Sequence, residues 1–173
     1  MANQTGGQAR SDRAMKHFFN QIRVEWLVTA FCAWHAADLV HAWRHSPYDR
    51  MGWLALTIWA GPAGRAIVRG AAPARDFKLT IASLMIALIG VLGDLNFLVY
   101  WGLAISIGSL AGVSGRAWLW LALAVCWMPF FGWFGSQLHL GAATLNILRL
   151  LVAFAAAAVG WCWLVPKRPK TAA

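Results

Sequence analysis

The stretch from Leu79 to Ser114 is almost continuously apolar, and it constrains the fold more than any other part of the sequence. A membrane-spanning helix needs about 20 apolar residues, so this stretch is too long for one span and short for two. The interruption at Gly93–Asn96 predicts two short helices. One long tilted helix ending near Tyr100, followed by a re-entrant segment, is the alternative.

Composition places the whole chain in the membrane class. Of its 173 residues, 60% are hydrophobic and 12% are charged, whereas a soluble domain carries about 25% charged residues. We therefore expect an all-α, polytopic integral membrane protein. The expected domains are a polar, basic N-terminal segment (1–23), a transmembrane helical bundle (24–165) and a basic C-terminal tail (166–173).

Breaks in the apolar pattern divide the rest of the bundle into four more helices, which are expected at Val24–Trp43, Met51–Val68, Ala117–Gly135 and Leu140–Val165. Pro62 lies in the middle of the second of these and should kink it, because proline lacks the backbone N–H that a helix interior uses. The chain thus predicts about six (five to six) transmembrane helices.

The positions of the basic residues favour six spans with both termini on the inner side. Inner loops of membrane proteins carry an excess of Lys and Arg. With six helices and the N-terminus inside, twelve of the fifteen basic residues lie at inner helix ends. Arg44 and Arg50 remain outside and Arg149 lies within the membrane. Five helices would place the basic tail outside, so we expect a multi-pass, N-in/C-in protein of the cell inner membrane.

Membrane topology also explains the net charge of +9. Its clusters flank apolar segments, which indicates topology and attraction to anionic headgroups and argues against nucleic acid as a partner. The expected partners are the lipid bilayer and either other membrane subunits or further copies of the chain.

One face of the first apolar segment carries ionisable side chains. At about 100° per residue, Asp38 and His41 fall within roughly 60° of each other, and His35 lies roughly 60° from Asp38. A charge near the bilayer centre costs on the order of 3 kcal/mol. We therefore expect Asp38 and Arg149 to face inward and form an ion pair, with Asp94 as a rival partner for Arg149.

Two interpretations of these buried polar residues remain open. The favoured one is structural, with the ion pair and hydrogen-bonded histidines locking the sixth helix to the first. The other is a ligand or cofactor cavity open to the outer side, because ionisable groups inside a membrane are frequently functional. Its candidate residues are His35, Asp38, His41, His139, Asn146 and Arg149.

A haem or chlorophyll-type tetrapyrrole is the cofactor that this chain could bind, with His35, His41 and His139 as candidate axial ligands. The spacing of His, Cys, Asp and Glu residues predicts no complete metal site. The sequence contains no hydrolase, metalloprotease or nucleotide-binding motif, so no catalytic residue is assigned.

Other residues are expected to pack. Gly108 and Gly112 form a GxxxG pattern, which is typical of close helix contacts in membranes. Most of the twelve tryptophans stand near segment ends, as in an interfacial belt. The four expected to pack deeper are Trp34, Trp59, Trp120 and Trp127.

These features predict an accessory or scaffold subunit of a larger inner-membrane complex, which could contact a tetrapyrrole or lipid cofactor. The first alternative is a small carrier or substrate-binding component with a polar site in the outer half of the bundle. The second is a membrane-embedded, lipid-modifying enzyme. Whether the chain is an enzyme stays open, with the sequence leaning against it.

Overall fold

The computed structural model describes residues 24–68 and 77–164, and all regular structure within them is helical. The expected N-terminal segment (1–23) and C-terminal tail (166–173) lie outside the described residues, as do Arg69 and Arg75 of the internal basic loop. The first helix covers residues 24–35 and is interrupted at 36–37 before α2 (Asp38–His45). After a short connection, α3 (Gly52–Val68) runs as one helix through Pro62.

The apolar stretch that begins at Leu79 folds as a helical hairpin of α4 (Phe77–Leu92) and α5 (Asn96–Ala111). Small residues allow the two helices to approach closely: a Cβ on Gly102 would lie 2.8 Å from the Cβ of Ala87. Thr80 Oγ1 and Ser109 Oγ share a hydrogen bond of 2.7 Å. The predicted break at Gly93–Asn96 is confirmed, and the alternative of one long helix is wrong.

The next segment departs from its prediction. In place of one helix over Ala117–Gly135, the chain forms η1 (Gly115–Ala117), α6 (Trp118–Ala122), η2 (Leu123–Trp127) and α7 (Pro129–Gln137). The axis bends by 71° between Trp127 and Pro129. The reason is Pro129, because proline disfavours the helical conformation at the residue before it, and Met128 is extended (ψ 146°). The last helix is α8 (Ala142–Trp163).

A tryptophan pair joins α3 to α6 in the core. Trp59 and Trp120 stack with ring centroids 4.2 Å apart and planes at 6°. Each indole donates a hydrogen bond to the other residue's backbone carbonyl, at 2.9 and 3.0 Å. These two residues and Trp127 are fully buried, as predicted, whereas Trp34 is 79% exposed and its predicted packing is wrong.

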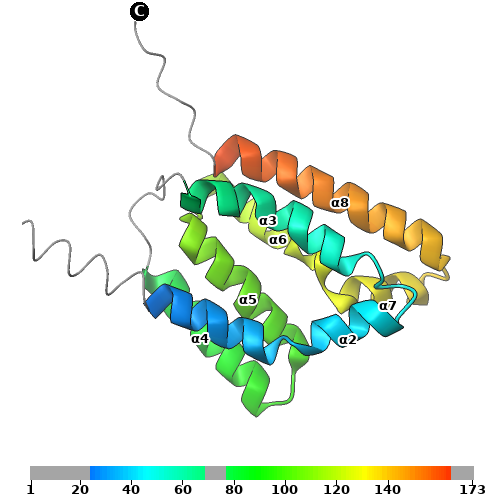
Figure 1. Ribbon diagram of the computed structural model, residues 1–173, viewed down its shortest axis with the longest axis horizontal. Helices are drawn as coiled ribbons and strands as arrows, with labels where there is room; N and C mark the ends of the chain where they lie inside the picture. Colours follow the sequence, from blue (N-terminus) through cyan, green and yellow to red (C-terminus); the bar gives the residue numbers. More distant parts are fainter. Residues whose placement is uncertain (1–23, 69–76, 165–173) are drawn as a thin grey trace, which may run out of the picture.

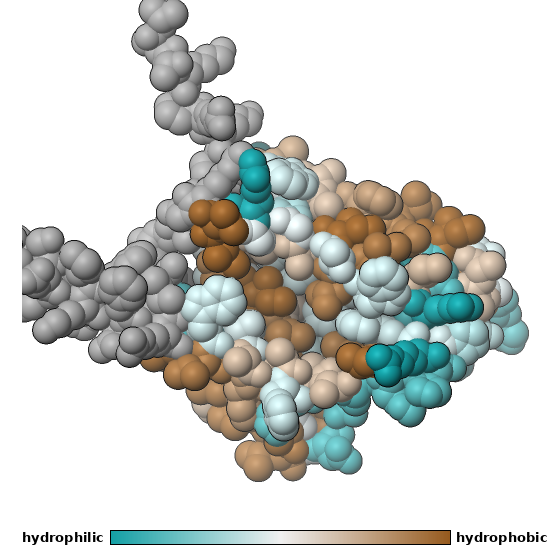
Figure 2. Space-filling model, viewed as in Figure 1, coloured by the Kyte–Doolittle hydropathy of each residue, from teal (hydrophilic) through white to brown (hydrophobic). Residues whose placement is uncertain are grey.

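The helices are arranged so that their ends gather at two ends of the molecule. Figure 1 shows the start of the first helix, the ends of α3 and α5 and the start of α4 on the left, near the end of α8. The α2–α3 connection and the α7–α8 turn lie together on the right. We call the right-hand region, residues 46–51 and 138–141, the loop end. Figure 2 shows hydrophilic residues gathered there, with apolar residues across the middle of the visible face.

Within the described residues, α8 is long and apolar enough to cross a membrane, and the bent unit of η1 to α7 would count as a second span. Only 22% of the most apolar stretch of α8 is buried, unlike the core helix of a soluble protein. α4 and α5 are apolar but shorter. At 16 residues each they reach about 24 Å, against a hydrocarbon core of about 30 Å.

Candidate functional site

A fully buried arginine of α8 is the centre of the polar cluster at the loop end. Arg149 has no exposed surface, and its Nη2 donates to Asp49 Oδ1 at 2.5 Å. Asp49 belongs to the α2–α3 connection and is itself 6% exposed. Nη2 also reaches the carbonyl of Tyr48 at 3.4 Å. The guanidinium thus holds the α2–α3 connection against α8.

Asn146, one helical turn before Arg149, holds the same connection. Its Nδ2 donates to the carbonyl of Pro47 at 3.0 Å and to that of Ala142 at 2.9 Å. Its Oδ1 accepts from the backbone N–H of Met51 at 3.4 Å. Since residues three and four apart share a helix face, Asn146 and Arg149 act as one clamp on residues 47–51.

Two glycines make room for this clamp. A Cβ on Gly132 of α7 would lie 2.8 Å from Asp49 Cγ, so the carboxylate packs directly on the glycine backbone. A Cβ on Gly52 would lie 2.8 Å from Arg149 Nη1 and would overlap the indole of Trp43. On another side, Arg149 Cζ lies 5.4 Å from the centre of the Phe131 ring. Glycine at these positions therefore lets charged groups be enclosed by backbone and aromatic rings.

The clamp leaves some polar atoms without partners. Arg149 Nε and Nη1 are buried and make no hydrogen bond within the described part of the chain, and the same holds for Trp127 Nε1. A buried donor without an acceptor costs about 1–3 kcal/mol, and more when the group is charged. Arg149 is consequently a buried cation with remaining capacity to bind an acceptor.

The expected partner of Arg149 is corrected by the structure. Asp38 lies in the first turn of α2, is exposed rather than facing inward, and accepts a hydrogen bond from the Tyr100 hydroxyl of α5, so it ties α2 to α5 and not to α8. Asp94 is exposed in the α4–α5 turn, with a positive φ of 53°. Asp49 takes the ion pair because the α2–α3 connection folds back over the start of α8.

The candidate histidines lie on the surface. His35 and His41 are exposed, the ring of His35 lies 4.6 Å from that of Phe31, and His41 stacks on His45 at 4.1 Å. His139 is exposed in the turn before α8, with a φ of 56°. The structure therefore brings Asn146 and Arg149 together but does not place these histidines beside them.

No group of three or more His, Cys, Asp or Glu side chains that could hold a metal ion occurs in residues 24–68 and 77–164. An apolar cavity of about 340 Å³ opens between α5 and the η2–α7 bend. Its lining residues, Phe97, Trp101, Val125, Met128 and Phe130, include no histidine that could ligate a tetrapyrrole.

The two glycines of the GxxxG pattern have different roles. Gly108 is buried in α5, where a Cβ would lie 3.3 Å from Val113 and 3.4 Å from Leu121. Gly112 is the C-cap of α5 and adopts a left-handed φ of 70°, which glycine tolerates without strain. Gly108 thus packs within the chain and Gly112 ends a helix, so the pair does not form one helix-packing face.

Sequence reasoning did not identify three residues of the site. Asp49 stands in a polar connection, where a charged residue ordinarily faces solvent. Tyr100 and Gly132 lie in apolar runs, and only their contacts with Asp38 and Asp49 distinguish them. The sequence signal that could have identified Asp49 is charge balance, because a buried arginine requires a carboxylate at the same depth in the fold.

Comparison with known proteins adds no family to this description. No protein-family model matches the chain, and no curated protein or solved structure matches it either.

Proposed function

We propose that this chain is a small integral membrane scaffold or accessory subunit of a larger inner-membrane complex. The observation that carries the proposal is the set of partners that the polar side chains have. The buried Arg149 and the half-buried Asn146 donate hydrogen bonds to the protein's own α2–α3 connection, and the exposed Asp38 accepts one from Tyr100. Polar groups that bond other parts of the same chain hold a fold together, which is what a scaffold requires.

A bilayer is the environment that best fits the surface. Exposed apolar residues repeat on one side of α4 at intervals of three or four, at Phe77, Ile81, Met85, Ile89 and Leu92. Continuous apolar surface of this kind is unstable in water and marks a membrane or protein contact. The proposed arrangement has six crossing segments, with the loop end outside and both termini inside.

A second exposed stripe suggests where a partner subunit would bind. Ile147, Leu151, Phe154 and Trp161 recur at helical spacing along α8 and are 48–62% exposed. In Figure 1, α8 forms the upper edge of the molecule and α4 lies along the lower edge, so the two stripes belong to opposite edges. The α8 stripe includes bulky aromatic residues, which dominate the energetics of buried interfaces.

The experiment is purification of the tagged full-length protein from its native membrane in a mild detergent, followed by native electrophoresis, mass spectrometry and an absorption spectrum. We expect stoichiometric partner subunits, or a homo-oligomer. Leu151→Ala with Phe154→Ala on α8 should release the partner, whereas the matched pair Ile81→Ala with Met85→Ala on α4 should not. A tetrapyrrole would add its own absorption bands, and His35→Ala, His41→Ala and His139→Ala would then identify the ligand.

Variants of exposed polar residues separate this proposal from its rivals. A scaffold tolerates His41→Ala with its complex intact, whereas a carrier loses substrate binding and a lipid-modifying enzyme loses turnover. A solitary, colourless protein whose α8 variants behave like wild type would refute the scaffold.

A carrier or substrate-binding component is the second candidate. The observation that favours it is the pair of buried, unpartnered nitrogens of Arg149, which could take up an acceptor group of a ligand. Specific binding of a small polar molecule, abolished by Arg149→Lys in a folded protein, would support this candidate.

A further inference from the structure

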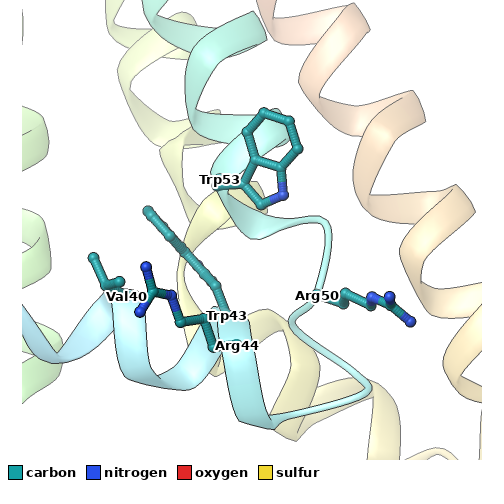
Figure 3. A pocket seen from close by; sticks show the side chains of 5 residues that line it. All are labelled: Val40, Trp43, Arg44, Arg50 and Trp53. Atoms are coloured by element: carbon teal, nitrogen blue, oxygen red, sulfur yellow. The ribbon is translucent and has the colours of Figure 1, made fainter.

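A pocket of about 520 Å³ opens at the junction of α2 and α3. Figure 3 shows its five lining side chains: Val40, Trp43 and Arg44 from α2, Arg50 from the connection and Trp53 from α3. Trp43 stands between Arg44 and Trp53, and Arg50 extends from the connection toward the other side. The pocket therefore combines the guanidinium of Arg44 with aromatic and aliphatic walls, and Arg50 lines its rim with the guanidinium pointing away from Arg44.

The charges around this pocket favour an anion. Arg44 and Arg50 are exposed, and neither forms an ion pair or a hydrogen bond with the described residues. Arg149 Nη1 lies behind the pocket wall, because it and the Trp43 indole both border Gly52. The nearby carboxylates are already engaged: Asp49 bonds Arg149 and Asp38 bonds Tyr100. Among the residues that the structure describes, no acidic side chain lines the pocket.

The apolar walls favour an amphipathic ligand over a small free anion. Trp53 is 54% exposed and Val40 is 46% exposed, so the pocket continues into an apolar surface. Tryptophan is enriched at the membrane interface because its ring is apolar and its N–H is polar. Guanidinium groups bind phosphate oxygens in bidentate geometry. A phosphate group with an attached hydrocarbon chain satisfies both parts of the lining.

The position of the two arginines gives an independent reason. In the proposed membrane arrangement, Arg44 and Arg50 are at the outer surface, where the positive-inside rule disfavours basic residues. Topology therefore does not explain them, whereas a bound anion does.

We propose that this pocket binds the phosphate headgroup of an anionic phospholipid, with its acyl chains along Val40 and Trp53. Arg44 contacts the phosphate, Arg50 adds positive charge at the rim of the pocket, and the indole of Trp43 forms the wall between the headgroup and the core. This inference rests on the proposed placement of the protein in a membrane. The ligand class is a lipid phosphodiester, and a free phosphate bound without a chain is the outcome to be separated from it.

Native mass spectrometry of the full-length protein in neutral detergent tests the proposal. The protein is titrated with palmitoyl-oleoyl phosphatidylglycerol, with phosphatidylcholine of the same chains and with inorganic phosphate. The variants are Arg44→Gln, Arg50→Gln and Trp53→Ala. Arg65→Gln is the matched control, because Arg65 is also exposed but lies near the far end of α3. An unchanged elution profile establishes that each variant is folded.

We expect phosphatidylglycerol to bind more tightly than phosphatidylcholine, and inorganic phosphate to bind least. Arg44→Gln and Arg50→Gln should each weaken phosphatidylglycerol binding about fivefold, since one basic residue near an anionic surface contributes about that much. Trp53→Ala should weaken lipid binding and leave phosphate binding unchanged, and Arg65→Gln should change neither.

Equal binding of the two lipids would overturn the proposal, as would an equal loss in Arg65→Gln. Phosphate binding as tight as lipid binding would identify a free-anion site and overturn the lipid assignment. Partner capture and membrane fractionation are measured separately. A missing partner with intact lipid selectivity therefore counts against the scaffold alone, and lost selectivity with an intact complex counts against the pocket alone.

Discussion

At the scale of single residues, the ion pair of Arg149 and Asp49 explains how a charge is kept inside an apolar helix. Arg149 begins the third turn of α8, about 10 Å from its first residue. Asp49 reaches it because the α2–α3 connection folds inward and Gly132 leaves space for the carboxylate. The pair matters chiefly because removal of either partner leaves the other charge buried alone.

Arg149→Met should therefore lower the free energy of unfolding by about 3–5 kcal/mol, because it strands the Asp49 carboxylate. The double variant with Asp49→Asn should lose clearly less than the sum of the two single losses. Denaturation of the purified protein in micelles, followed by circular dichroism, measures these values. Arg44→Met, at an exposed arginine without a partner, is the control and should change little. Additive losses would mean that the two charges do not interact.

Gly132→Ala tests the space under the carboxylate. The added Cβ would meet the Asp49 carboxylate, so we expect a loss of about 1–3 kcal/mol in the same assay. Gly64→Ala is the matched control, because a Cβ there meets nothing within 4 Å. It should be neutral or stabilise the protein by up to about 1 kcal/mol through helix propensity. Equal behaviour of the two variants would contradict the close packing of Asp49.

What the sequence could reveal about this site depends on the residue. Arg149 and Asn146 are recognisable because polar side chains in an apolar run require partners. Asp49 is not, since a hundred residues separate it from Arg149 and a charge in a polar connection looks exposed. The predicted ion pair of Arg149 with Asp38 is wrong. The alternating direction of successive helices fixes how deep each residue lies in the membrane, but it does not determine which helices are neighbours.

At the scale of elements, helix ends were predictable where local chemistry decides them. The α4–α5 turn follows from Gly93–Asn96, which interrupts an apolar run. The bend at Pro129 was missed, although proline and its preceding residue carry that signal. The stack of Trp59 on Trp120 could not be foreseen, because it joins helices that are distant in sequence.

Trp59→Phe and Trp120→Phe test this junction between α3 and α6. Each keeps an aromatic ring but removes an indole N–H that bonds the opposite backbone carbonyl. Each should cost at least about 1 kcal/mol in thermal or chemical unfolding. The double variant should cost less than the sum, because both changes act on one stack. Trp34→Phe, at a residue 79% exposed, should have no effect. A similar loss from all three would indicate a general dependence on tryptophan.

At the scale of the whole molecule, the fold places apolar stripes on its outer edges and its polar clamp at the loop end. α8 is long enough to span a bilayer, whereas α3, α4 and α5 have 16 or 17 residues. A short helix is accommodated by local thinning of the bilayer at a modest cost. All-helical architecture was predictable from apolar run length, and the number of crossing segments remains a prediction.

The most direct test of that prediction is the side of the membrane on which each helix end lies. Single cysteines at Val68, Leu95, Ser114 and Leu138 are placed in a Cys162→Ser background, with the buried Cys32 and Cys126 retained. Cells with an accessible inner membrane are then treated with a membrane-impermeant maleimide.

The proposed topology predicts that Leu95 and Leu138 are labelled while the inner membrane of these cells is intact. Val68 and Ser114 should be labelled only after the inner membrane has been permeabilised. Labelling of all four positions from one side, or recovery of the protein in the soluble fraction, would contradict the membrane bundle on which this account depends.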